Sequence, residues 1–329
     1  MKENSMSSTL DWKIIHALQV DGRAPFSRIA EVLGISPQTV SRRYSRLRST
    51  GALRVLGLTS PDALHEEEWF LRIQCAPDSA LTVASALARH PETTWVHLTS
   101  GGTEIVCFTR ADLGSEPGLL RKLPETPRVR GITAHCLLHT YYGRELSTIN
   151  KTGPLTDEQV NRLRPGSPRP TGSADLTPAD RKMLHALRLD GRATFHDLAR
   201  TTGWSQSTVQ RRLTELRQQG LLYFDVDYAP DVIGYQKLII LLLSVTPGCL
   251  NAAGEALGQH RETAFVTSTT GPFNLFAAIT CADTRALHQY LTGPAAALPN
   301  VVQMETVPVI RTLKRAGLPT PVTSAHNAR

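Results

Sequence analysis

Residues 33–53 read LGISPQTVSRRYSRLRSTGAL, and residues 202–222 read TGWSQSTVQRRLTELRQQGLL. In both segments a serine precedes a run with apolar residues at helical spacing, and a glycine follows the run. Serine is a favourable helix N-cap because its hydroxyl accepts a hydrogen bond from the first turn, and glycine ends a helix in the left-handed conformation. The two segments therefore predict matching helices, which begin after Ser36 and Ser205.

These segments belong to an internal repeat. Shifting residues 10–53 by 169 positions onto residues 179–222 gives 21 identities in 44 positions, including an Asp-Gly-Arg triplet at 21–23 and 190–192. A fainter similarity continues beyond them, so that each copy covers about 145 residues. The chain is therefore a tandem duplication of one unit.

Each copy begins with the pattern of a helix-turn-helix. In the first copy, Leu10, Ile14 and Leu18 recur at helical spacing, after a capping Ser8 or Thr9. The Asp-Gly-Arg triplet ends that helix, and a short second helix follows and ends at a glycine. Helix, four-residue turn with glycine, and helix together form the arrangement that many DNA-binding domains use.

The outward face of the third helix carries the side chains expected to contact DNA. In the first copy this helix has arginines and no acid, opposite an apolar stripe of Val40, Tyr44 and Leu47. Short polar groups and arginine can reach base edges, whereas arginines at the flanks contact phosphates, Arg48 and Arg217 among them. The predicted DNA-binding residues are Gln38, Thr39, Ser41, Arg42, Arg43, Ser45 and Arg46 in the first copy, and Ser207, Thr208, Gln210, Arg211, Arg212 and Thr214 in the second.

Two other interpretations of these residues stay open. A basic helix face is often only solvated. Arg43 and Arg212 can equally be structural, paired with acids of the first helix or of the turn that follows it. These acids are Asp11 and Asp180 in the helix, and Asp21 and Asp190 in the turn. The two helix acids are expected to cap a first turn or to form ion pairs rather than to act in binding.

The composition favours a polyanionic partner. The formal net charge of +7 and the pI near 9.3 suit nucleic acid or an anionic membrane. The sequence begins with polar residues rather than a secretion signal, and its longest aliphatic run, residues 238–243, is far shorter than a membrane span. We therefore expect a cytoplasmic protein without a membrane partner.

The remaining motifs indicate no metal, no cofactor and no catalytic residue. Five cysteines lie at positions 75, 107, 136, 249 and 281, at least 29 residues apart, which excludes a Cys-x-x-Cys zinc motif. Their odd number argues against a disulfide framework, so reduced thiols are expected. No phosphate loop, dinucleotide fingerprint or nucleophile–base grouping stands out.

The second part of each copy predicts a small α/β domain. Residues 238–243, LIILLL, are apolar at consecutive positions, so both faces of this strand are expected to be buried. The order strand, helix, strand, strand, helix, strand is ferredoxin-like. In the second copy these elements are expected at 237–245, 251–258, 263–268, 273–281, 283–291 and 301–310. In the first copy they are expected at 69–76, 79–89, 94–98, 104–109, 113–122 and 129–139.

A segment rich in proline and glycine separates the two copies. It runs from Gly153 to Ala174 and contains RPGSPRPTG. Such a composition is typical of an exposed, semi-stiff linker, which a short helix near 157–164 is expected to interrupt.

The two recognition segments resemble those of the Lrp/AsnC (leucine-responsive, feast/famine) transcription regulators. The shared pattern G-x-S-x-x-T-V-x-x-R is present as GISPQTVSRR from Gly34 and as GWSQSTVQRR from Gly203. The preceding LDWKIIHALQVDGRAPFSRIAEV and ADRKMLHALRLDGRATFHDLAR match the first two helices of the family, and YAPDVIGY at 228–235 matches its connector. The resemblance covers nearly the whole chain, but most members hold one unit, whereas this chain holds two.

The resemblance implies DNA binding controlled by an amino acid or a similar small effector, bound near the turn between the second and third strands. The residues at these turns are Ser100, Gly101, Gly102 and Glu104 in the first copy, and Thr270, Gly271, Phe273 and Asn274 in the second. Asn274 replaces an acid of the family pattern and the first copy lacks its aromatic residue, so the effector sites are expected to differ or one to be silent. The glycines can equally serve only to form the turns.

The resemblance also implies that the α/β sheets pair face to face, which the two domains of one chain could do as a built-in pseudo-dimer. The expected fold class is α+β, with two winged-type helix-turn-helix domains and two ferredoxin-like βαββαβ (RAM/AsnC effector) domains in tandem. The helix-turn-helix domains are expected at 1–62 and 176–230, the effector domains at 63–150 and 231–318, the linker at 151–175 and a tail at 319–329. The expected partners are double-stranded DNA, a small effector and self-association through the effector domains.

Two other functions stay open. Some relatives of this layout resemble sirohaem decarboxylases, for which His97, His135 and His139 are candidate proton donors. Against this, the second copy has no histidine in the matching strands, and both recognition helices keep polar outward faces that an enzyme would not need. The other function is that of a nucleoid-architectural protein with little sequence preference. A DNA-binding regulator, and not an enzyme, is the function that the sequence favours.

Overall fold

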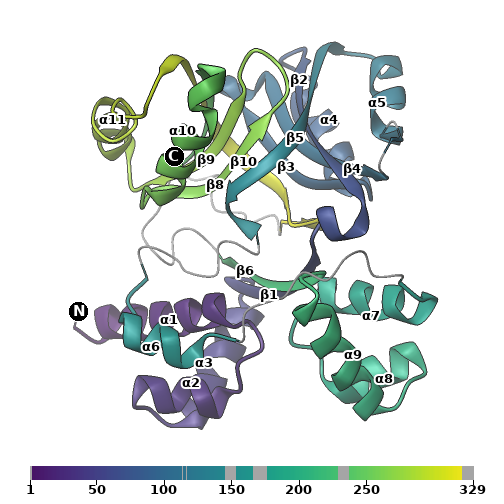
Figure 1. Ribbon diagram of the computed structural model, residues 1–329, viewed down its shortest axis with the longest axis vertical. Helices are drawn as coiled ribbons and strands as arrows, with labels where there is room; N and C mark the ends of the chain where they lie inside the picture. The colour runs from purple at the N-terminus through teal and green to yellow at the C-terminus, as the bar shows by residue number, and fades with distance from the viewer. Residues whose placement is uncertain are drawn as a thin grey trace.

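The computed structural model describes residues 2–112, 114–115, 117–144, 153–165, 176–228 and 237–320. Two helical heads lie side by side next to a β-sheet body (Figure 1). The first head consists of α1 (Lys2–Val20), α2 (Phe26–Leu33) and α3 (Pro37–Ser49), and the second of α7 (Pro178–Leu189), α8 (Phe195–Thr202) and α9 (Gln206–Gln218). Strands β1 (Leu53–Thr59) and β6 (Leu222–Tyr228) pair antiparallel and join the heads. Among the described residues no helix is long and apolar enough to cross a bilayer.

Local sequence sets the bounds of the recognition helices α3 and α9. The side chains of Ser36 and Ser205 each accept a hydrogen bond from the backbone N–H three residues on, which confirms the predicted N-caps. Gly34 and Gly203 adopt the left-handed conformation and end the helices before them. The helix-turn-helix is thus present in both copies with the same caps.

One helix boundary differs from the prediction. Helix α1 extends to Lys2, through the positions where Ser8 or Thr9 was expected to cap it. Residues 2–8 contain neither proline nor glycine, so nothing in their sequence stops the helix.

Both α/β domains have the predicted ferredoxin-like order. The first contains β2 (Glu66–Cys75), α4 (Ala80–Arg89), β3 (Thr93–Thr99), β4 (Glu104–Asp112), α5 (Gly118–Lys122) and β5 (Val129–Tyr142). The second contains β7 (Lys237–Val245), α10 (Leu250–Gln259), β8 (Thr263–Thr269), β9 (Leu275–Cys281), α11 (Thr284–Thr292) and β10 (Val301–Arg315), and the short β11 (Leu318–Pro319) pairs with the end of β10.

The two sheets of one chain join into a closed structure. The hydrogen-bonded order is β10-β3-β4-β2-β5-β8-β9-β7, and β7 pairs back with β10. The seams between the copies are β5–β8 and β10–β3, because β5 and β10 are longer than expected and continue past their own sheets. The built-in pseudo-dimer is therefore present, and its sheets pair along their edges as well as face to face.

The interior between the sheets is a separate apolar core. It contains Phe70, Val106, Phe108, Ile240, Leu242, Phe276 and Val307. Along β7, Ile240 and Leu242 face this interior, whereas Ile239, Leu241 and Leu243 pack with the helices outside. Both faces of the LIILLL strand are buried, as predicted.

The predicted linker contains an element that belongs to the first head. Helix α6 (Asp157–Leu163) confirms the expected short helix, but Leu155, Val160 and Leu163 are buried in the core of that head rather than exposed. Gln159 also donates to the carbonyl of Val32, at 3.1 Å. The rest of the segment, residues 166–175, lies outside the described residues.

Buried His16 lies beneath this added helix. Its Nδ1 accepts a hydrogen bond from the backbone N–H of Leu155, at 3.2 Å. Burial lowers the pKa of His16 to about 4, so the ring is neutral at pH 7. The equivalent histidine of the second copy, His185, is exposed.

Candidate nucleic-acid interface

The predicted base-reading faces of α3 and α9 point outward. Val40, Tyr44 and Leu47 are buried on α3, as are Val209, Leu213 and Leu216 on α9. Exposed side chains on the opposite faces are Gln38, Arg42, Ser45 and Arg46 in α3, and Ser207, Gln210, Arg211 and Thr214 in α9, with Ser41 half-exposed. The exposure is what a major-groove helix requires, and contact of these residues with DNA stays a prediction.

Two of the predicted site residues complete the N-caps. The hydroxyl of Thr39 lies 2.9 Å from that of Ser36, and the hydroxyl of Thr208 lies 2.9 Å from that of Ser205. These threonines therefore stabilise the first turn of each recognition helix, whatever further contact they make.

Arg43 and Arg212 pair with the acid of the first helix, which is one of the two structural interpretations above. Arg43 donates to Asp11 at 2.9 Å, and Arg212 donates to Asp180 at 2.7 and 3.0 Å. The Asp180 side chain is wholly buried. Burial favours a raised pKa for Asp180, but hydrogen bonds from Arg212 and Thr177 outweigh it and hold the pKa below its usual value. The pairs fix each recognition helix to its head.

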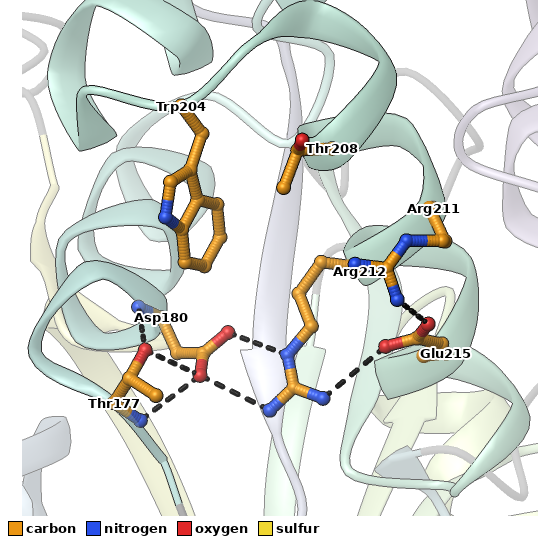
Figure 2. Close-up of a pocket in the computed structure, with 7 residues that line it drawn as sticks. All are labelled: Thr177, Asp180, Trp204, Thr208, Arg211, Arg212 and Glu215. Atoms are coloured by element: carbon orange, nitrogen blue, oxygen red, sulfur yellow. Dashed lines mark hydrogen bonds and ion pairs between the residues drawn. The ribbon is translucent and has the colours of Figure 1, made fainter.

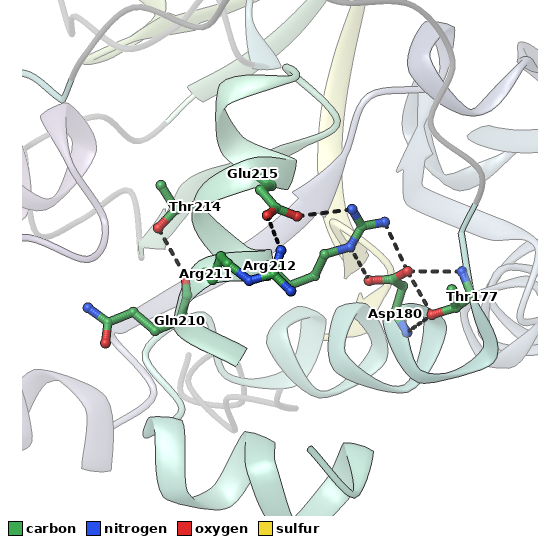
Figure 3. Close-up of polar contacts among 7 residues, drawn as sticks. All are labelled: Thr177, Asp180, Gln210, Arg211, Arg212, Thr214 and Glu215. Atoms are coloured by element: carbon green, nitrogen blue, oxygen red, sulfur yellow. Dashed lines mark hydrogen bonds and ion pairs between the residues drawn. The ribbon is translucent and has the colours of Figure 1, made fainter. Parts of the chain in front are cut away.

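The equivalent positions Arg46 and Glu215 behave differently. Arg46 forms an ion pair with Asp11 and remains half-exposed. Glu215 instead accepts from Arg211 at 2.6 Å and from Arg212 at 3.3 Å, as Figure 3 shows. The absence of an acid from α3 is visible in the sequence, but the pairing of this glutamate with two arginines of α9 is not predicted by it.

Arg48 and Arg217 connect the two heads through ion pairs, and their contact with phosphates stays a prediction. Arg48 pairs with Asp190 at 2.8 Å, and Arg217 pairs with Asp21 at 3.0 Å. Each arginine thus joins the recognition helix of one copy to the turn of the other. The Arg48 side chain is still 54% exposed, whereas that of Arg217 is 26% exposed.

The two Asp-Gly-Arg triplets dock the heads on each other. Arg23 donates to the carbonyls of Gly191 and Ala193, at 2.8 and 3.1 Å. Arg192 donates to the carbonyls of Gly22 and Ala24, at 2.7 and 3.1 Å, and its guanidinium lies 4.4 Å from the centre of the Phe26 ring. Sequence reasoning assigned the triplets only to helix termination, although their identity in both copies was a signal of a shared role.

A pocket of about 310 Å³ lies against the second recognition helix. Its lining residues are Thr177, Asp180, Trp204, Thr208, Arg211, Arg212 and Glu215. Figure 2 shows the Trp204 indole on one side and the Arg212–Asp180 pair on the other. The position of Trp204 is held by Ile35 in the first copy, so the flanks of the two recognition helices differ in shape as well as in charge.

In the first copy, the predicted effector turn lies at the seam of the two α/β domains. Ser100, Gly101 and Gly102 have positive φ angles, as a tight turn requires. Glu104 is buried and accepts from Ser100 at 2.8 Å and from Arg72 at 2.7 Å. Arg72 also holds Glu305 of the second copy, at 2.7 and 3.0 Å, so this predicted effector residue takes part in joining the copies.

The turn of the second copy lies against β5 of the first. The Asn274 side chain bonds both the N–H and the carbonyl of Val245, at 2.9 and 2.8 Å. The Thr270 carbonyl lies 2.8 Å from Nδ1 of His135, and the Thr270 hydroxyl accepts from the N–H of Cys136. A side chain at Gly271 would collide with His135, which explains the glycine without a ligand. Phe273 packs against the interior core.

The three histidines considered for catalysis differ in exposure. His97 is buried, stacks on Trp95 and shares a hydrogen bond of 3.0 Å with Thr312. Burial lowers its pKa to about 3, which leaves it neutral. His135 stacks on Phe70 and is buried as well, whereas His139 is exposed.

Comparison with known proteins identifies similar domains in both copies. An AsnC-type helix-turn-helix domain matches residues 9–48 and 176–217, and an Lrp/AsnC ligand binding domain matches residues 238–319. The HTH-type transcriptional regulator FL11 of Pyrococcus horikoshii is 27% identical over 140 residues, which cover 42% of this chain and 92% of FL11. The regulatory protein AsnC of Escherichia coli is 28% identical over 146 residues, which cover 41% of this chain and 93% of AsnC.

A solved structure shares the fold of nearly the whole chain. The siroheme decarboxylase NirDL superposes with a TM-score of 0.62 over 94% of each chain, at 12% sequence identity. At that identity the likeness concerns the fold alone. The regulators, by contrast, each correspond to about one of the two copies in this chain.

Proposed function

Because the chain belongs to the Lrp/AsnC family of transcription regulators, in a form that contains the family unit twice, we propose that one polypeptide presents two recognition helices to a single DNA duplex. The reciprocal docking of the heads supports this proposal most strongly, since Arg23 and Arg192 hold α3 and α9 in one unit. A homodimeric regulator obtains its pair of heads from two chains. Here a single chain already contains the pair.

The two heads should prefer different half-sites. Three pairs of equivalent outward positions differ: Gln38 and Ser207, Ser41 and Gln210, and Ser45 and Thr214. Identical heads read a palindrome, whereas unequal heads read unequal half-sites, with centres about 10 bp or a small multiple apart. Such a protein acts where the chromosome is, in the cytoplasm.

Selection of genomic fragments with the purified chain tests this function. The expected result is a small set of fragments, bound by one chain per duplex with an affinity that falls as salt rises. A footprint on the strongest fragment should show two different half-sites. No salt-dependent affinity for any duplex would refute DNA binding, and equal affinity for all fragments would indicate an architectural protein.

We propose further that a small effector, such as an amino acid, acts at the seams between the α/β domains. Thr270 bonds Cys136 of the other copy directly, and Glu104 holds Arg72, which in turn binds Glu305 of the other copy. A ligand at either turn would therefore change how the copies are paired. Genomic selection with and without mixed amino acids tests for an effector. Self-association through the same domains is tested by measuring the mass of the protein in solution with and without the mixed amino acids.

A sirohaem-decarboxylase activity is a second candidate, because NirDL shares the fold over nearly the whole chain and because His97 and His135 lie between the sheets. Sirohaem absorbs visible light, so a titration of the purified chain detects its binding directly. A change in the absorption spectrum followed by loss of carboxylate would favour the enzyme. An unchanged spectrum together with selective DNA binding would favour the regulator.

A further inference from the structure

We infer that the two heads differ in strength, and that Glu215 makes the second head the weaker one. The inference rests on the DNA binding proposed above. It concerns how much each half-site contributes to the total binding affinity. The difference follows from one pair of equivalent positions, Arg46 in α3 and Glu215 in α9.

The exposed arginines of α3 are available to phosphates. Arg42 is exposed and, within the part of the chain that the structure describes, has no hydrogen-bond or ion-pair partner. Arg46 shares Asp11 with Arg43, and its side chain is still 54% exposed. Helix α3 therefore presents two cationic groups that can approach a phosphate backbone with little rearrangement.

The same face of α9 is neutralised. Arg211, the equivalent of Arg42, is 69% exposed, but its guanidinium donates to Glu215 one turn further along the helix. Glu215 also touches Arg212, which its head already holds through Asp180. An approaching phosphate would have to displace the carboxylate from Arg211 and would be repelled by it.

The glutamate contributes little to the stability of the head. An ion pair at i, i+4 on a helix surface is a weak interaction, and here the Arg211 side chain is 69% exposed and that of Glu215 33%. Arg212 keeps Asp180 as its partner when Glu215 is replaced, so the recognition helix stays anchored. The acid therefore acts on binding far more than on folding, and its variants are expected to fold.

The test replaces Glu215 in the full chain and measures affinity for the selected operator over a range of salt concentrations. E215R installs the residue type of the first head, and E215Q removes only the charge. E255R and E255Q make the same charge changes on the exposed face of α10, far along the chain from the heads. R46E gives the first head the acid of the second. Thermal unfolding of each variant verifies folding.

The expected results are opposite for the two heads. E215R should tighten binding about threefold to tenfold near 0.1 M salt and steepen the dependence of log affinity on log salt by about one. E215Q should have a smaller effect of the same sign, and R46E should weaken binding. In wild type, scrambling the half-site read by α3 should cost more than scrambling the other, and E215R should reduce that difference.

The half-sites are assigned with R42A and R211A, each of which should relax base preference on one side only. Wild-type binding together with no effect of E215R beyond that of E255R would overturn the inference and leave the proposed function intact. An equal loss from scrambling either half-site would also overturn it. Failure of the folded wild-type chain to bind any duplex would remove both.

Discussion

Arg23 of the first head donates to the backbone carbonyl of Gly191 in the second, at 2.8 Å, across 168 positions of sequence. Arg192 makes the equivalent bond to Gly22. A Cβ atom at Gly191 would lie 2.8 Å from the backbone of Leu56, so this triplet needs its glycine for the close approach of the β1 ribbon. These two arginines therefore dock the heads through backbone carbonyls, which a change of other side chains does not remove.

Removal of this docking should separate the heads. R23A and R192A each leave two partly buried carbonyls without a charged donor, which should cost about 2 kcal/mol of stability per arginine. Urea unfolding measures the loss of stability. The double variant should also bind an operator with two half-sites more weakly than a loss of affinity at either half-site alone would explain. R200A is the control, because Arg200 lies in the second head with Arg192, is 77% exposed and should change stability by less than about 0.5 kcal/mol.

Loss of the Arg212–Asp180 pair should destabilise the second head. R212A leaves the buried Asp180 carboxylate without its cation, at a cost of about 3 kcal/mol at pH 7. In wild type the pKa of Asp180 is lowered, so its contribution is present above the ordinary aspartate pKa and is lost in acid. In R212A burial should instead raise that pKa. The difference between the two proteins in urea unfolding should shrink as the pH falls towards 4, and a constant difference would contradict this account.

The packing of α6 against the first head should weaken in acid. The pKa of His16 falls from 6.5 to about 4 on folding, so between these values the unfolded chain binds a proton that the folded head does not. Stability is full at pH 7 and should drop by about 2–3 kcal/mol as the pH falls through this interval.

Hydrogen exchange of residues 155–163 at pH 7 and pH 5 would detect the loosening of α6. H16Q keeps an acceptor for the Leu155 N–H but does not titrate, so its exchange should depend less on pH. H185Q changes the exposed histidine of the second copy and should behave as wild type. Equal pH dependence in all three proteins would exclude His16 as the cause.

Arg42 should matter more for DNA binding than its equivalent, Arg211. R42A removes an exposed arginine that has no partner among the described residues, and it should cost about 1–3 kcal/mol of binding free energy on the specific operator. R211A removes an arginine already held by Glu215, so the loss should be smaller. Gel-shift titrations of both variants measure the two losses, and a larger loss for R211A would reverse the proposed order of the heads.

Local patterns in the sequence were sufficient to predict much of this fold. Capping serines, left-handed glycines and the stripe of Val40, Tyr44 and Leu47 depend on neighbouring residues only, so both heads could be located. The LIILLL strand indicated burial on both faces. The outward residues of α3 and α9 follow from the same helical periodicity.

Contacts between distant segments could not be predicted in this way. The three apolar residues of α6 occur in a segment whose prolines favour an exposed linker, and burial of Leu163 depends on a groove that only the folded head provides. Arg48 and Arg217 lie at flanks where phosphate contact is common, and only the docked heads show that acids of the other copy hold them. The closed sheet depends on the extra length of β5 and β10.

Joining both copies in one polypeptide changes how the two sheet seams can evolve. In an assembly of identical subunits, every substitution is mirrored at the symmetric position. Here β5–β8 and β10–β3 are encoded separately. The contacts between the copies already differ, since Arg72 of β2 binds Glu305 of β10, whereas His135 of β5 lies against Thr270. Each side of the protein is therefore free to specialise without a matching change in its counterpart.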